Sequence, residues 1–145
     1  MTDYIKKLEF RLVNYVCDKV FKFKCSDDVA NSKIIKDELV NCDREKFLVF
    51  LLDGKNRVSS YEVVSIGSLS SSIVHPRESF KAAVKSNAAS VIFVHNHPTG
   101  DPTPSSDDIA ITKRLVEAGK ILGIKVLDHI IVGDTHFSFS EENLL

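Results

Sequence analysis

VIFVHNHPTGDPTPSSDD, residues 91–108, carries the strongest structural signals in the chain. Its first four residues are apolar and mostly β-branched, which predicts a short buried strand. Prolines and a glycine between positions 98 and 104 then exclude regular structure. Ser105 begins a helical pattern of apolar residues that continues to Leu122. The stretch therefore predicts a strand, an irregular loop and a helix in succession.

Two histidines end the predicted strand. Side chains alternate between the faces of a strand, so His95 and His97 project from the same face. Asp108 lies in the first turn of the predicted helix and can turn back toward the strand end. Two imidazole nitrogens and one carboxylate oxygen leave the fourth tetrahedral position open for water, as in catalytic zinc sites. One zinc ion held there would lower the pKa of water and polarise a substrate carbonyl.

Each part of this pattern also has a plain structural interpretation. Ser105 and Asp108 fit the Ser-x-x-acid sequence that caps helix N-termini. Capping and metal binding are compatible, because a first-turn aspartate can do either. A single histidine at a strand end is usually a hydrogen-bonded polar residue. Two of them, followed at once by Pro98, favour a metal site.

The spacing resembles the H-x-H-x7-S-x2-D signature of the JAMM/MPN metalloproteases. More narrowly, residues 75–134 are similar to the RadC family, whose members are historically labelled DNA repair proteins. The likeness extends from about position 44 to the C-terminus. It implies an α/β fold, a three-layer α-β-α MPN (JAMM) domain, cytidine deaminase-like, with a mixed β-sheet.

The resemblance also implies roles for individual residues. His95, His97 and Asp108 would be the zinc ligands, and Ser105 would hydrogen-bond the water or the oxyanion. The family needs an upstream glutamate as general base, and Glu45 matches its place immediately before an apolar strand.

Glu78 is the alternative general base. It falls in the first turn of a predicted helix, where a negative charge is favourable without any catalytic role. Asn96 stands where deubiquitinating members of the superfamily usually have serine or threonine, which argues against a ubiquitin-like substrate. It points away from the ligand face, so the metal site is unaffected.

The expected activity is that of a zinc metallopeptidase or isopeptidase acting on a peptide or protein substrate. Two alternatives remain open: a DNA-repair-associated nucleic-acid-binding or nuclease protein, and a catalytically silent interaction scaffold. The net charge of −1 provides no global field to attract nucleic acid. An intact ligand set argues against the scaffold.

Length and composition predict one globular domain. The chain has 145 residues, of which 43% are hydrophobic and 27% charged. Its three cysteines are widely spaced and form no Cys-x-x-Cys, which predicts reduced thiols and a cytoplasmic location. We expect no membrane span and no signal peptide.

Periodicity predicts the remaining elements. We expect residues 1–22 to be an N-terminal amphipathic helix packed on an MPN domain at 23–145. Within the domain we expect helices at 28–40 and 76–87, and strands at 47–52, 58–66, 125–132 and 136–139. Residues 68–72 form either a loop or a weak edge segment. His129 is either near the metal or a hydrogen-bonded core residue, whereas His75 and His136 are structural or exposed.

Overall fold

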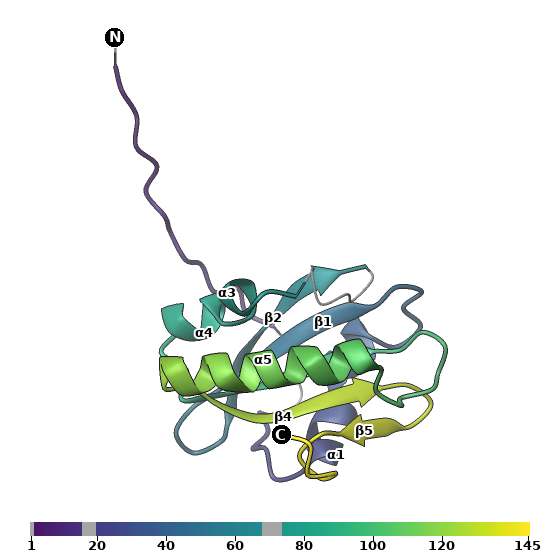
Figure 1. The fold of residues 1–145 in the computed structure, drawn as a ribbon. Coiled ribbons are helices and arrows are strands. Elements are labelled where there is room, and N and C mark those ends of the chain that lie inside the picture. The colour runs from purple at the N-terminus through teal and green to yellow at the C-terminus, as the bar shows by residue number, and fades with distance from the viewer. Residues whose placement is uncertain (1, 16–19, 68–73) are drawn as a thin grey trace.

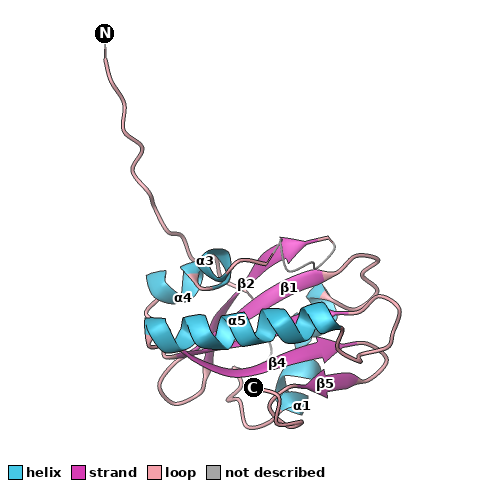
Figure 2. Ribbon diagram, viewed as in Figure 1, coloured by secondary structure: helices cyan, strands magenta, loops and turns pink. Residues whose placement is uncertain are grey.

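A central β-sheet with helices on both faces forms the domain (Figures 1 and 2). The computed structural model describes residues 2–15, 20–67 and 74–145. Within these ranges the elements are α1 (Ser26–Ala30), α2 (Lys33–Glu38), β1 (Lys46–Leu52), β2 (Val58–Ile66), α3 (Pro76–Ser79), α4 (Lys81–Lys85), β3 (Ser90–Asn96), α5 (Ser106–Leu122), β4 (Lys125–Val132) and β5 (His136–Ser138).

The sheet is mixed, in the order β2-β1-β3-β4-β5. Strand β1 runs antiparallel to both β2 and β3, and β4 runs antiparallel to β5. Strands β3 and β4 run parallel, and α5 is the crossover between them. The predicted α/β class with a mixed sheet is therefore confirmed.

Alternating side chains along β1 and β3 divide the core into two layers. Residues of one parity pack under α3, α4 and α5; they include Phe47, Val49, Leu51, Val91 and Phe93. Residues of the other parity pack against α1 and α2; they include Leu48, Phe50, Leu52, Ile92 and Val94. Because both faces are covered, these strands are continuous apolar runs in the sequence. His95 follows the parity of Phe93, which places it on the α5 face.

Helix α5 begins and ends where the sequence predicts. The hydroxyl of Ser105 caps it by accepting a hydrogen bond from the backbone N–H of Asp108. At the other end, Gly123 adopts a left-handed conformation with φ of 72°, which glycine tolerates without steric cost. The start of this helix is therefore fixed against the end of β3.

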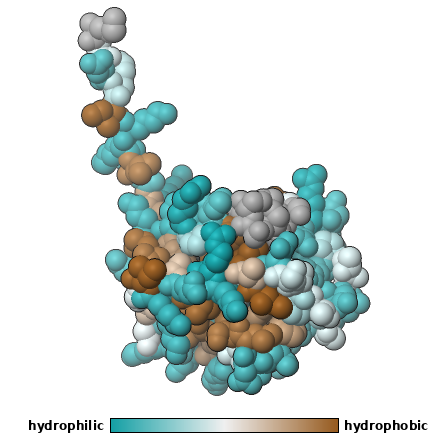
Figure 3. Space-filling view, in the orientation of Figure 1, coloured by the Kyte–Doolittle hydropathy of each residue, from teal (hydrophilic) through white to brown (hydrophobic). Residues whose placement is uncertain are grey.

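The described part of the predicted N-terminal helix, residues 2–15 and 20–22, contains no helix. Residues 2–15 form neither helix nor strand. The arm projects away from the domain toward the N-terminus (Figures 1 and 3), whereas Tyr15 packs edge-on against Tyr61 of β2. Residues 16–19, the next part of the prediction, lie outside the described residues. An amphipathic helix of this length depends on packing of its apolar face. Here Ile5 and Leu8 are exposed, so the arm lacks that support.

Two predicted helices are each divided in two. The helix expected at 28–40 is interrupted before Ser32, whose hydroxyl instead caps the separate α2. The helix expected at 76–87 is interrupted at Phe80, and Val84 is half exposed rather than buried. The loop or edge segment expected at 68–72 falls outside the described part of the chain.

Candidate metal centre

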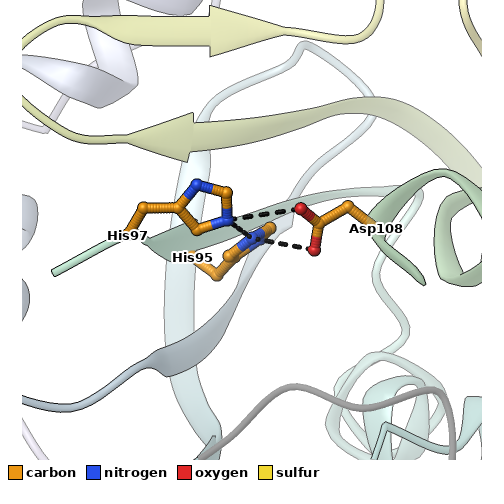
Figure 4. A group of neighbouring side chains, drawn as sticks. All are labelled: His95, His97 and Asp108. Atoms are coloured by element: carbon orange, nitrogen blue, oxygen red, sulfur yellow. Dashed lines mark hydrogen bonds and ion pairs between the residues drawn. The ribbon is translucent and has the colours of Figure 1, made fainter. Parts of the chain in front are cut away.

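The carboxyl end of β3 meets the amino end of α5, and three potential metal ligands lie there (Figure 4). His95 is the second-last residue of β3, and His97 follows the strand directly. Asp108 is in the first turn of α5. Ligand sites commonly lie beyond the carboxyl ends of strands in α/β sheets.

The ligand atoms converge on one point. Nε2 of His95 and Nε2 of His97 are 3.1 Å apart. The first lies 3.2 Å from Oδ1 of Asp108, and the second lies 3.2 Å from Oδ2. Two imidazole nitrogens and a carboxylate are a donor set suited to a divalent transition metal, zinc above all. These residues therefore fit the expected ion.

The carboxylate of Asp108 is buried yet ionised. Burial raises the pKa of this carboxyl, but the hydrogen bond and charge of a protonated His95, together with the hydrogen bonds of Ser105, outweigh burial and hold the pKa well below the ordinary range. Its Oδ2 accepts the backbone N–H of Ser105 at 2.8 Å. The capping box and the ligand cluster thus coexist, as the sequence allowed.

A backbone carbonyl holds the ring of His97. Nδ1 of His97 lies 2.8 Å from the carbonyl oxygen of Asp101, so it carries the proton and Nε2 is left bare. The loop that supplies this carbonyl rests on the β4–β5 turn. There the N–H of Asp134 donates to the carbonyl of Gly100 at 2.7 Å. A Cβ on Gly133 would lie only 2.3 Å from the same carbonyl oxygen.

His129 contacts the ring nitrogen of His95 that does not face Asp108. Its Nε2 lies 2.8 Å from Nδ1 of His95. Its ring stacks on Phe139 and meets the edge of Phe47, and burial lowers its pKa well below the ordinary value. The expectation of a hydrogen-bonded core residue is confirmed, and a role of His129 as a further ligand or acid stays a prediction.

Sequence reasoning missed Thr112. Its hydroxyl lies 2.6 Å from Nδ1 of His129 and donates to the backbone carbonyl of Asp108 at 2.7 Å. The available signal was a polar residue on the buried face of α5, between Ile111 and Leu115.

The backbone around Glu45 is held at the same end of the sheet. Phe47 pairs with His95 in the antiparallel ladder, so continuing the register places Glu45 opposite His97. The side chain of Asn96 accepts the N–H of Lys46 at 2.7 Å. The carbonyl of Glu45 also accepts the N–H of Gly67 at 2.8 Å.

Glu78 lies in a different setting. It is exposed and pairs with Lys81 at 3.0 Å, which lowers the pKa of its carboxyl. Its neighbour Arg77 lines a hollow of about 500 Å³ with Ala118 and Leu122, at the carboxyl end of α5. Asp108 is at the amino end of that helix, so the segment that carries Glu78 lies at the opposite end of α5 from the cluster.

Ser105 is exposed beside Asp108. Because its oxygen accepts the capping hydrogen bond, its own O–H remains a donor for another group. His136 bonds Ser26 at 2.9 Å, and His75 is the N-cap residue of α3. Neither belongs to the His95, His97 and Asp108 cluster.

Together, the mixed sheet and the His-His-Asp cluster define a JAB/MPN-type domain with a candidate metal site. Residues 23–144 match the family described as RadC-like JAB domain, and the chain belongs to this family.

Curated relatives are similar over about three quarters of the chain. The chain is 66% identical over 109 residues to a UPF0758 protein of Pelobacter propionicus, covering 74% of this chain and 48% of the relative. It is 56% identical over 115 residues to a UPF0758 protein of Desulforamulus reducens, covering 79% and 50%. The chain spans about half the length of the curated relatives it matches. Among the described residues, no helix combines the length and apolar character needed to span a bilayer.

Proposed function

We propose that this domain is a zinc-dependent metallohydrolase, a metallopeptidase or isopeptidase whose substrate is a peptide or protein. The observation that carries the proposal is the convergence of His95 Nε2, His97 Nε2 and the Asp108 carboxylate on one point. His95 and Asp108 are buried and His97 is partly exposed, so the site opens on one side. A substrate and water can reach it from that side.

The residues around the cluster supply the other parts of a hydrolysis. A bound zinc ion would lower the pKa of water and polarise the scissile carbonyl. Glu45 would take a proton from the attacking water and return it to the leaving amine. The O–H of Ser105 would donate to the developing oxyanion, which a preorganised donor stabilises without reorganisation.

Elemental analysis of the purified protein tests the metal. We expect about one zinc per chain in the wild type, and its loss from a His95→Ala/Asp108→Ala double variant. The matched control is His75→Ala/Asp107→Ala, since Asp107 is exposed in the same first turn of α5. Equal zinc in the two double variants, or none in the wild type after zinc is offered, would reject the site.

Activity is tested separately on peptide and isopeptide substrates. Zinc-loaded protein should cleave one of them, and the His95→Ala/Asp108→Ala variant should not. Zinc retention with no cleavage of either class would favour the scaffold over the enzyme.

A further inference from the structure

A buried row of hydrogen bonds runs from α5 to the cluster. It passes from the carbonyl of Asp108 to the hydroxyl of Thr112, then to Nδ1 of His129. From Nε2 of His129 it continues to Nδ1 of His95. The contacts measure 2.7, 2.6 and 2.8 Å in this order. All four residues are at most 3% exposed, so water does not compete for these bonds.

The direction of every bond in this row follows from the number of protons available. A hydroxyl has one hydrogen, and a backbone carbonyl can only accept. Thr112 must therefore donate to Asp108 and accept from His129, whose Nδ1 carries the proton. A neutral imidazole has one N–H, and His129 is buried among aromatic rings where a charge would be costly. Its Nε2 is then an acceptor, and Nδ1–H of His95 donates to it.

Along the row itself, the opposite direction leaves one contact without a proton. If Thr112 donated to His129, the hydroxyl and the Asp108 carbonyl would face each other at 2.7 Å with only lone pairs between them. His129 would then donate to His95, and the N–H of His95 would point into the cluster.

We propose that Thr112 and His129 are positioning residues that hold His95 in the Nδ1–H tautomer, with the Nε2 lone pair turned toward the ligand cluster before any metal arrives. The value of this arrangement for zinc binding depends on the proposed function; the tautomer itself does not. His97 needs no such row, because the Asp101 carbonyl fixes its tautomer directly. Outer partners of this kind typically change metal affinity by about 10- to 100-fold.

Long-range ¹H–¹⁵N correlation spectra of the metal-free wild type test the tautomer. We expect the proton on Nδ1 in both His95 and His129. A proton on Nε2 of His95 would overturn the proposal, whatever the variants do. Because this spectrum is recorded without metal, it gives an answer even if the wild type binds no zinc. Failure of the wild type to bind zinc would reject the proposed function and leave the proposed tautomer standing.

Two substitutions at Thr112 test the origin of the tautomer. Thr112→Val removes the hydroxyl at nearly constant volume, and Thr112→Ser keeps it. The serine variant should retain both tautomers, and its zinc affinity in a chelator competition should lie within about threefold of the wild type, well short of the effect of losing an outer partner. The valine variant should lose the preference for Nδ1–H and bind zinc roughly 10- to 100-fold more weakly. Wild-type tautomers and affinity in a folded Thr112→Val protein, checked by circular dichroism, would overturn the proposal.

Discussion

Oδ1 of Asn96 accepts a hydrogen bond from the backbone N–H of Lys46 at 2.7 Å. The amide nitrogen of the same side chain donates to the carbonyl of Arg44 at 3.0 Å. Asn96, which lies between the two histidines, therefore hydrogen-bonds the backbone on both sides of Glu45. This contact joins the metal-ligand candidates to the proposed general base, although they are far apart in the sequence.

Replacing Asn96 should separate metal binding from catalysis. The hydroxyl of Asn96→Ser is too short to reach both backbone groups, so at least one of the two hydrogen bonds is lost, at a cost of about 0.5–1.5 kcal/mol. We expect a lower free energy of unfolding in urea, unchanged zinc content and reduced hydrolysis. Asn96→Asp keeps the acceptor for Lys46 but places a buried carboxylate oxygen against the carbonyl of Arg44, so it should be destabilised at least as much. Loss of zinc from Asn96→Ser would contradict this account.

Glu45→Gln should slow hydrolysis strongly without releasing zinc. General acid–base catalysis is worth about 10²- to 10⁴-fold, so we expect a fall in kcat of that order. The matched control is Glu78→Gln, which loses only the exposed pair with Lys81 and should keep full activity. The reverse result, with Glu78→Gln inactive and Glu45→Gln active, would transfer the role to Glu78.

Gly133→Ala should disturb the metal site from a distance. The new Cβ would collide with the backbone of Gly100 and displace the loop whose Asp101 carbonyl holds His97. Overpacking of this kind costs about 1–3 kcal/mol. Thermal unfolding and zinc titration should both show a loss. Gly54→Ala, where no atom lies within 4 Å of the added Cβ, is the control and should change neither.

Metal removal should lower stability only when the ligand set is intact. A ligand that binds the native state alone stabilises it by about 2.7 kcal/mol at a concentration 100 times its Kd. A chelator should therefore lower the urea midpoint of zinc-loaded wild type and of Asp107→Asn. Asp108→Asn should show little change, because it lacks the carboxylate that completes the cluster. An equal chelator effect on all three proteins would mean that zinc is bound elsewhere.

Local signals in the sequence predicted most of the sheet and all of α5. Strands β2 and β4 have the predicted bounds, because apolar runs there end at clear turn residues. Ser105 and Gly123 marked the ends of α5 through capping chemistry. The spacing of His95, His97 and Asp108 predicted that they would converge, because strand alternation and a helix start constrain them within one short segment.

Features that depend on tertiary packing were not predictable in this way. The periodicity of the N-terminal arm is that of an amphipathic helix, but nothing in a period says whether a surface will cover its apolar side. Ser32 interrupts a helical pattern because its own capping bond competes with helix continuation. The contacts of Thr112 with His129, and of Asn96 with Lys46, join segments that are distant in the sequence. Residue spacing does not predict such contacts.

The placement of all three ligand candidates on β3, α5 and the loop between them has a consequence for the order of folding. Closing a short loop costs little chain entropy, so this unit can gather its ligands early. Glu45 reaches the site only when β1 pairs with β3, a contact of much greater sequence separation that forms more slowly. A nascent chain would therefore assemble its three ligand candidates first, and the proposed general base would join them only once the sheet is complete.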